Sequence, residues 1–170
     1  PLIWTYFGPI VRQDWLDRLG LPLPETIGDW YTMLKAFKER DPNGNSQADE
    51  LPFITRNGFQ DISRGAAFIS AWGITAEFFK KGEQVLYGPV EPGYKEFLAT
   101  MNNWYKEGLI DPDVIASDAK TSDAKVTQGK AGSFIGYVGG GIDYYLSSAV
   151  GTDSGFDLSG TVYPTLNRGE

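Results

Sequence analysis

Oxygen-bearing side chains are concentrated in residues 41–50, DPNGNSQADE. The carboxylate and amide side chains of this short stretch include Asp41, Asn43, Asn45, Asp49 and Glu50. Such groups suit a hard cation such as Ca²⁺, which takes about six to eight oxygen ligands from carboxylates, amides and backbone carbonyls. The Asp-Pro and Asn-Gly pairs in the same stretch are also strong signals of an ordinary polar turn. The segment therefore indicates either a metal site or a turn.

The spacing of these residues favours calcium. In the helix-loop-helix calcium loop, ligands alternate from the first to the ninth position, the sixth residue is Gly and a Glu at the twelfth closes the loop. Oxygen-bearing side chains occupy the first, third, fifth and ninth positions here: Asp41, Asn43, Asn45 and Asp49. Gln47, at the seventh, can offer its backbone carbonyl. The pattern departs at Ser46 and Pro52, in the sixth and twelfth positions. Because Glu50 can close a tighter loop, we expect a structural calcium ion at 41–50.

The composition excludes several function classes. The 170 residues include no Cys and no His, which removes Cys nucleophiles, Ser-His-Asp triads and most zinc sites. A net charge of −7 and scattered basic residues argue against a nucleic-acid partner. No apolar run approaches the ~18–20 residues that span a bilayer. The chain opens inside an apolar stretch and stops at Glu170 without a capping element, so we expect a piece of a longer protein.

Hydrophobic periodicity predicts strands alternating with helices. β-branched and aromatic residues predict strands over 2–12, 51–55, 131–138 and 160–164, and a hairpin over 77–90. Helical spacing predicts helices over 13–20, 26–40, 58–71, 92–107, 121–129 and 142–149. Thr26 is the expected N-cap of the second helix, with Asp29 three residues on. This order predicts an α/β fold in which helices flank a mixed sheet.

One block of the sequence carries a resemblance to a known family. Residues 10–53 read IVRQDWLDRLGLPLPETIGDWYTMLKAFKERDPNGNSQADELPF. This block resembles the family 1 extracellular solute-binding proteins of ABC importers, and most of all the branch with alginate-binding proteins and oligosaccharide-importer lipoproteins. Those carry an RxDWLDKLGL-like segment, a helix and a DxNGNxxxDE-like loop. The segments GEQVLYGPVEPGYKEFLATMNNWYKEGLIDPD, GKAGSFIGYVGG and YPTLNRGE also fit, so the resemblance runs through most of the chain.

The resemblance implies a fold, a function and a location. The family has a class II periplasmic-binding-protein-like fold, with two α/β lobes joined by crossover strands and the ligand held in the cleft. Residues 1–170 would be the second, C-terminal lobe, and the 41–50 loop would bind an EF-hand-like structural Ca²⁺ away from the sugar. The resemblance also implies an oligosaccharide ligand, an ABC permease partner, a monomer, and a protein that is lipid-anchored outside the cell or periplasmic. It implies no enzymatic activity.

Candidate ligand contacts come from the ends of the expected strands, because open α/β sheets bind ligands beyond the carboxyl ends of their strands. Trp72 lies outside a clean apolar stripe and is a candidate for stacking on a sugar; the alternative is that it covers the core under the hairpin. Tyr137, at a strand end, is a second stacking candidate. Gly139 and Gly140 expose backbone amides at a helix start, although a tight turn without ligand is as common.

Four further residues are candidates for polar or stacking contacts. Asn57, Phe59 and Gln60 follow the strand over 51–55, where related sugar-binding lobes place contacts. Arg12, at the end of the first strand, could meet an acidic sugar or pair with Asp14 or Asp17. Together with the aromatic candidates, these residues predict a sugar-binding edge of the sheet.

Two other functions compete with solute capture. A glycoside-active enzyme needs two carboxylates facing one cleft, either ~5–5.5 Å or ~6.5–9.5 Å apart, and nothing in the sequence pairs them. A calcium-dependent interaction module of the cohesin-binding type needs a duplicated loop, and the sequence has one. The sequence therefore favours a substrate-capture protein.

Overall fold

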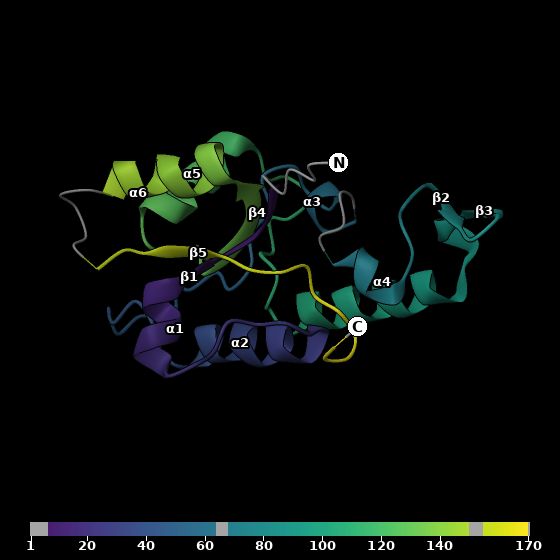
Figure 1. Cartoon of the computed structure of the whole chain (residues 1–170). Helices are drawn as coiled ribbons and strands as arrows, with labels where there is room; N and C mark the ends of the chain where they lie inside the picture. Colours follow the sequence, from purple (N-terminus) through teal and green to yellow (C-terminus); the bar gives the residue numbers. More distant parts are fainter. Residues whose placement is uncertain (1–6, 64–67, 150–154, 170) are drawn as a thin grey trace.

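The computed structural model describes residues 7–63, 68–149 and 155–169. Its centre is a sheet in the order β4 (Ser133–Tyr137), β1 (Phe7–Arg12) and β5 (Leu158–Gly160). Helices α5 (Ala119–Thr127) and α6 (Tyr144–Ala149) cover one face, and α1 (Gln13–Leu19) and α2 (Ile27–Glu39) cover the other (Figure 1). The layered α/β architecture is thus confirmed.

The remaining elements extend to one side of the sheet. They are α3 (Gln60–Ser63), the 3₁₀ turn η1 (Ile69–Trp72), β2 (Phe78–Lys81), β3 (Gln84–Tyr87), the 3₁₀ turn η2 (Gly88–Val90) and α4 (Pro92–Lys106). The β2–β3 hairpin projects beyond α4 (Figure 1). No described helix has the length and apolar character to cross a membrane.

The sheet is mixed, as expected. β1 runs antiparallel to both β4 and β5. On the other side of β4, residues 51–54 run parallel to it, through a bridge between Leu51 and Ala131 and a hydrogen bond from the Ile54 N–H to the Ser133 carbonyl at 3.0 Å. A second parallel bridge joins Phe53 to Ile110. The predicted strand over 51–55 is therefore an extended segment held by bridges on both sides.

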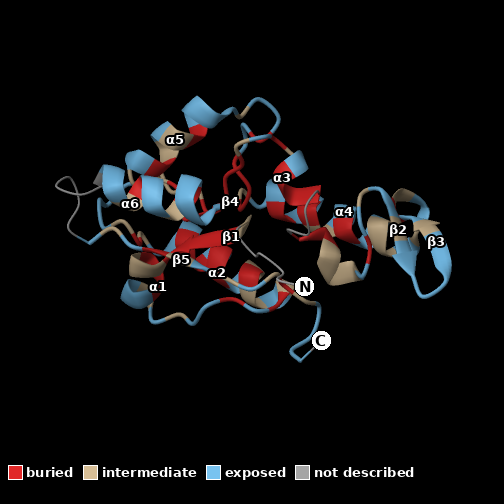
Figure 2. Cartoon of the chain, turned by 45° about the horizontal axis from the view of Figure 1, so that its top comes forward, coloured by how far each residue is buried: buried red, intermediate tan, exposed pale blue. Residues whose placement is uncertain are grey.

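Alternation along the strands fills two cores, because successive side chains of a strand point to opposite faces. Val11, Phe53 and Ile135 pack toward α1, α2 and α4. Their neighbours Ile10, Ile54 and Phe134 pack toward α5 and α6. Both cores are continuous with buried helix faces (Figure 2). This two-sided burial explains why the central segments read as nearly unbroken apolar runs.

The helix ends follow local chemistry. The Thr26 hydroxyl accepts from the Asp29 N–H at 3.1 Å, and the Asp29 carboxylate accepts from the Thr26 N–H at 3.0 Å. This reciprocal capping box satisfies two backbone donors that the first turn of α2 leaves unpaired. Gly20 and Gly108 adopt left-handed φ angles of 67° after α1 and α4, where a residue without a Cβ ends a helix at least cost. The predicted boundaries of these helices are confirmed.

Other boundaries were wrong. The helix predicted over 58–71 is divided into α3 and η1, and residues 64–67 lie outside the described residues. The helix cannot include Gly58, because its φ of 65° is left-handed. The Asp61 carboxylate accepts from the backbone N–H groups of Arg56 and Asn57 at 2.7 and 3.0 Å. Residues 1–6 of the predicted first strand also lie outside the described part.

The last strand was placed too late. β5 covers Leu158–Gly160 rather than residues 160–164. It pairs with Ile10–Arg12, and the chain then continues beside β1, where the Thr161 N–H donates to the Pro9 carbonyl. Gly139, Gly140 and Gly141 lie within a wide helical turn, η3 (Val138–Asp143), rather than before the helix.

Candidate functional site

The carboxyl ends of β4 and of the 51–54 segment lie at the same edge of the sheet, because the two are parallel. Ligands of open α/β sheets bind beyond such ends. A polar cavity of about 700 Å³ lies here, lined by Arg56, Asp123, Gly139, Gly140, Asp143, Tyr144, Ser147 and Ser148. Two strand ends and helices α5 and α6 thus build one open site.

An ion pair fixes the charged wall of this cavity. Arg56 Nη2 lies 3.2 Å from Asp123 Oδ1, and 29% and 26% of the two side chains are exposed. The buried Tyr145 hydroxyl donates to the same oxygen at 2.5 Å. Burial, followed by the hydrogen bond to Asp123, raises the pKa of Tyr145, so the phenol keeps its proton. Asp123 is therefore held from two sides, by α6 and by the strand end.

Two exposed tyrosines lie at this edge of the sheet, and one of them, Tyr144, lines the cavity. Tyr137, the last residue of β4, is 49% exposed, and its ring centroid lies 4.6 Å from that of Phe7. Tyr144 is 48% exposed and packs 5.1 Å from the buried ring of Tyr145. Exposed rings fixed by neighbouring aromatics can stack on the apolar faces of sugars at low entropic cost. The arrangement can therefore bind a polyhydroxyl ligand.

Several sequence-predicted residues meet at this edge. Gly139 and Gly140 line the cavity, and Tyr137 ends β4 two residues before Gly139. Asn57 is exposed beside Arg56, and its side-chain amide donates to Asp61 Oδ1 at 2.9 Å. Gln60 is exposed at the start of α3. The structure thus brings the polar candidates to the ends of two neighbouring strands.

Three predicted candidates lie elsewhere. Trp72 and Phe59 are partly buried against Phe97 of α4, with ring centroids 5.5 and 6.0 Å away, and pack onto the core beside α2 and α4. Arg12 is buried at the opposite edge, because β1 runs antiparallel to β4. Its Nε and Nη2 donate to the Asp14 carboxylate at 2.8 and 2.6 Å. The pairing alternative for Arg12 and the core alternative for Trp72 match this geometry.

Sequence reasoning missed Arg56, Asp123 and Tyr144. Arg56 had a usable signal, since it follows Thr55 directly at the end of a buried segment, one residue before the predicted Asn57. Asp123 had none, because its partner lies 67 residues away in the chain. Only the packing of α5 over the sheet brings the two together.

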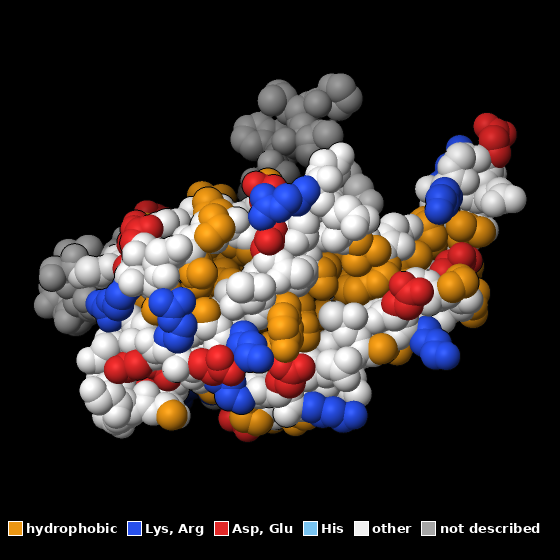
Figure 3. Space-filling view, turned by 90° about the horizontal axis from the view of Figure 1, so that it is seen from below, with side chains coloured by type: hydrophobic (Ala, Val, Ile, Leu, Met, Phe, Trp, Pro, Cys, Tyr) orange, Lys and Arg blue, Asp and Glu red, His pale blue; other side chains and the backbone are white. Residues whose placement is uncertain are grey.

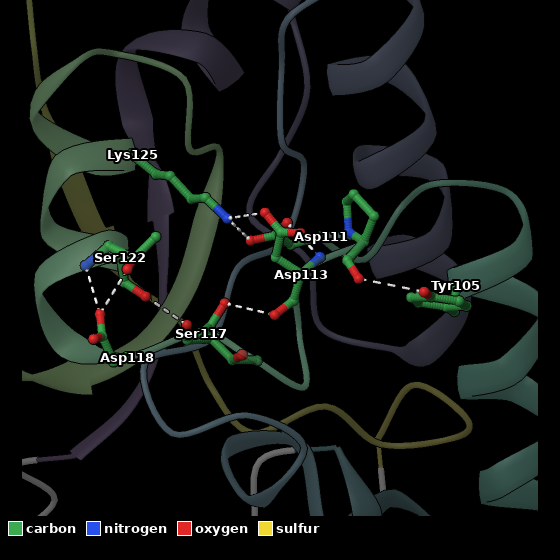
Figure 4. Close-up of polar contacts among 10 residues, drawn as sticks. Tyr105, Asp111, Asp113, Ser117, Asp118, Ser122 and Lys125 are labelled. Atoms are coloured by element: carbon green, nitrogen blue, oxygen red, sulfur yellow. Dashed lines mark hydrogen bonds and ion pairs between the residues drawn. The ribbon is translucent and has the colours of Figure 1, made fainter.

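The loop after residues 109–111 is tied to α5 (Figure 4). Lys125 Nζ lies 2.5 Å from the buried Asp111 carboxylate and 3.3 Å from that of Asp113. Burial alone lowers the pKa of Lys125, but hydrogen bonds and charge from Asp111 and Asp113 outweigh this and raise it. The Ser117 hydroxyl donates to the Asp113 carbonyl at 3.1 Å. These contacts hold α5, and with it Asp123, in place.

The 41–50 loop forms a second, separate polar cluster. Asp41 accepts from the backbone N–H groups of Asn45 and Ser46 at 3.1 and 3.0 Å. Asp49 accepts from the side-chain amides of Asn43 and Asn45 at 3.2 and 3.0 Å, and pairs with Lys130 at 3.2 Å. The described residues include no group of three His, Cys, Asp or Glu side chains placed to hold a metal ion. The loop is thus hydrogen-bonded to itself.

Two features of the loop nevertheless fit a cation. Ser46 has a φ of 59°, the left-handed conformation for which calcium loops use Gly at this position. Glu50 Oε1 is buried without a hydrogen-bond partner. Burial, and then the negative charges of Asp41 and Asp49, raise the pKa of Glu50. A partly buried carboxylate of this kind is unfavourable unless a positive charge offsets it.

Comparison with known proteins places this fold in a family. Residues 1–161 match the model of the bacterial extracellular solute-binding proteins. The chain belongs to this family. It is 35% identical over 136 residues to the lipoprotein LipO of Bacillus subtilis, covering 74% of this chain and 26% of LipO. It is 34% identical over 130 residues to FusA of Streptococcus pneumoniae, a fructooligosaccharide ABC transporter substrate-binding protein, covering 73% of this chain and 24% of FusA.

Solved structures of the family share the fold. The alginate-binding protein AlgQ2 superposes with a TM-score of 0.81 at 26% identity, over 97% of this chain and 34% of AlgQ2. FusA of S. pneumoniae in complex with kestose superposes with a TM-score of 0.70 at 26% identity, over 90% of this chain and 30% of FusA. The chain spans about a quarter of the length of the curated relatives that it matches.

Proposed function

We propose that this chain is the second, C-terminal lobe of the substrate-capture protein of an ABC importer, and that it binds an oligosaccharide in the cleft between two lobes. The observation that carries the proposal is the polar cavity with exposed tyrosines at the carboxyl edge of the sheet, in a chain of the solute-binding family. The named ligands of similar proteins, kestose for FusA and stachyose for a Bacillus licheniformis sugar transporter, support this ligand class.

The site offers the two kinds of contact that a sugar needs. Tyr137 and Tyr144 present rings to the apolar faces of pyranose or furanose units. Arg56, Asp143 and Ser147 present donors and acceptors to hydroxyls. Closure of a second lobe over this edge would exclude water and complete the binding site, as in hinge-type binding proteins.

The family also supports a location and a partner. We propose that the full-length protein is a monomer outside the cytoplasmic membrane, either lipid-anchored or periplasmic, and that it delivers its ligand to an ABC permease. The lipoprotein name of LipO and the transporter name of FusA support these proposals. The relatives are substrate-binding proteins, which supports a function without catalysis.

We further propose that residues 41–50 bind a structural Ca²⁺. The side chains of Asp41, Asn43, Asn45, Asp49 and Glu50 and the carbonyl of Gln47 would hold it. The partnerless Glu50 oxygen and the left-handed Ser46 support the fit. Among similar solved proteins, FusA has an EF-hand mutant and AlgQ2 has a structure without calcium ion. The ion would fix the end of α2 to the 51–54 segment, away from the sugar edge.

Calorimetry on the full-length protein tests the sugar proposal. Neutral oligosaccharides such as kestose and stachyose should bind, and Tyr144→Ala should weaken binding by about fivefold, because a stacked ring contributes on the order of 1 kcal/mol. Tyr87→Ala is the matched control, since Tyr87 is also exposed but lies on the projecting hairpin. Equal losses from both variants would contradict the assignment of the site.

A further inference from the structure

The polar cavity at the carboxyl ends of β4 and the 51–54 segment, called here the carboxyl-edge cavity, has more acidic than basic side chains in its described lining. Among the described residues, its lining contains one cation, Arg56, and two carboxylates, Asp123 and Asp143. Asp143 is exposed, and no described ion pair involves it. The described lining of the cavity therefore carries one net negative charge.

The single cation is also committed to a partner. Arg56 pairs with Asp123 at 3.2 Å, and Asp123 is held in turn by the buried Tyr145 hydroxyl at 2.5 Å. A sugar carboxylate that bound Arg56 would either share a guanidinium whose charge Asp123 already offsets, or draw Arg56 away from Asp123. The Asp123 charge would then remain without its cation in a partly buried position, which is unfavourable. Binding at Arg56 is therefore weaker for an anionic ligand than binding at an arginine without an acidic partner.

Other described cations do not compensate. Lys125 is tied to Asp111 and Asp113, and Arg12 is buried at the opposite edge with Asp14. Lys120 lies on an exposed part of α5 and does not line the cavity. Among the residues that the structure describes, the cavity lining has no cation without an acidic partner.

Uncharged hydroxyls meet none of these obstacles. The described side-chain contacts of Arg56 use only Nη2, so Nε and Nη1 can donate to a hydroxyl without breaking the ion pair. The Asp143 carboxylate can accept from a sugar hydroxyl. Because a hydroxyl both donates and accepts, it can bind the carboxylate or the guanidinium. Repulsion between like charges weakens the binding of the disfavoured ligand, and this is a common source of specificity.

Resting on the proposed function, we infer that this cavity selects neutral oligosaccharides and rejects those that carry uronic-acid carboxylates. Calorimetry on the full-length protein, with a panel of neutral oligosaccharides and oligomers of galacturonate and mannuronate, tests the inference. The tightest neutral ligand should bind at least about tenfold more strongly than any acidic one. An acidic oligomer that binds as tightly would overturn the inference and leave the proposed function standing. Absence of binding by the whole panel would overturn both.

Removing the partner of Arg56 sharpens the test. Asp123→Asn keeps the shape of the side chain and frees the guanidinium, so the preference for neutral over acidic oligomers should narrow by about tenfold. Glu96→Gln, an exposed neutralisation on α4, is the control for net charge and should leave the preference unchanged. If Asp123→Asn fails to fold, the exposed Asp143→Asn serves the same purpose. An unchanged preference in a folded variant contradicts the charge argument.

Discussion

Glu50 and Ser46 account for the two departures of the 41–50 loop from the usual calcium pattern. Ser46 takes the left-handed conformation that Gly normally takes, at a φ of 59°, and the loop tolerates this because Ser46 N–H is bonded to Asp41. Glu50 places a carboxylate oxygen in a buried position without a partner, near Asp41 and Asp49. At the level of single residues, the loop stores an electrostatic cost that a bound cation would remove.

Glu50→Gln should therefore have opposite effects with and without calcium. In chelator, the neutral amide should stabilise the protein, because it relieves burial of a charge beside two carboxylates. With Ca²⁺ in excess, the variant should lose most of the ligand-linked stabilisation, which is about 2.7 kcal/mol for the parent at one hundred times Kd. Thermal melts in chelator and in Ca²⁺ measure both effects.

Gln47→Ala is the matched control for this crossover. Gln47 is expected to contribute its backbone carbonyl, so removal of its exposed side chain should leave calcium-dependent stabilisation nearly intact. A parent protein whose melting temperature is the same in chelator and in Ca²⁺ would contradict the calcium proposal. The family assignment would be unaffected, since it depends on other residues.

Residue types at strand ends were partly readable from the sequence. Tyr137, Gly139 and Asn57 could be placed because each lies at or just after the end of an expected strand. Arg12 was misplaced for the same reason, since it also ends an expected strand, and only the antiparallel pairing of β1 with β4 shows that its end lies at the other edge. Strand direction is a long-range property, and local patterns carry no information on it.

Among the elements, α2 is the best specified by sequence, and Asp29 is central to it. Besides closing the capping box with Thr26, Asp29 accepts from Arg168 Nη2 at 3.0 Å, and the Ile27 N–H bonds to the Thr165 carbonyl at 3.0 Å. Burial raises the pKa of Asp29, but hydrogen bonds from Thr26, Glu25 and Arg168 outweigh it and lower the pKa. The start of α2 thus anchors the segment that follows β5.

This lowered pKa predicts a pH-dependent contribution to stability. A carboxyl whose pKa is lower in the folded state stabilises it above the unfolded pKa, 3.8, and the contribution is lost as pH falls through the lower folded value. Asp29→Asn should lower the free energy of unfolding by about 0.5–1 kcal/mol at pH 7, a modest value because the side chain is partly exposed. Urea denaturation of parent and variant at several pH values should show the difference shrinking below pH 3.8.

The exposed Glu39→Gln, at the other end of α2, is the control. Glu39→Gln should lower the free energy of unfolding by less than about 0.5 kcal/mol at pH 7, because it removes only an exposed i,i+4 ion pair with Lys35. An Asp29→Asn deficit that persists unchanged at low pH would show that shape, and not charge, explains the effect.

Elements with strong periodicity and caps were predicted well, and those shaped by tertiary contact were not. α2, α4 and the β2–β3 hairpin follow their patterns closely. Residues 58–71 carry apolar residues at helical spacing, but the Asp61 carboxylate binds the preceding backbone, and the described residues of this range form the short elements α3 and η1. β5 ends at Gly160 because the next residue of β1, Pro9, accepts from the Thr161 N–H but has no N–H to return; this limit is set by β1 and not by the sequence of β5.

For the whole molecule, the chain enters and leaves the sheet side by side. The Thr161 N–H donates to the Pro9 carbonyl at 2.9 Å, and the Tyr163 hydroxyl donates to the Phe7 carbonyl. Elsewhere, Figure 3 shows positive and negative side chains interspersed on the described part of the lower face, without a broad basic area. In the proposed two-lobe protein, the paired entry and exit segments would form the hinge, close to the carboxyl-edge cavity.

A two-lobe mechanism predicts that residues 1–170 alone bind sugar weakly. If this lobe supplies about half of the binding free energy of a micromolar complex, about −4.1 of −8.2 kcal/mol, its own Kd falls in the millimolar range. Parallel titrations of residues 1–170 and the full-length protein with the same oligosaccharide measure the ratio, and small-angle scattering of the full-length protein should show contraction on binding as the lobes close. Micromolar binding by residues 1–170 alone, with no contraction of the full-length protein, would mean that one lobe holds the ligand unaided.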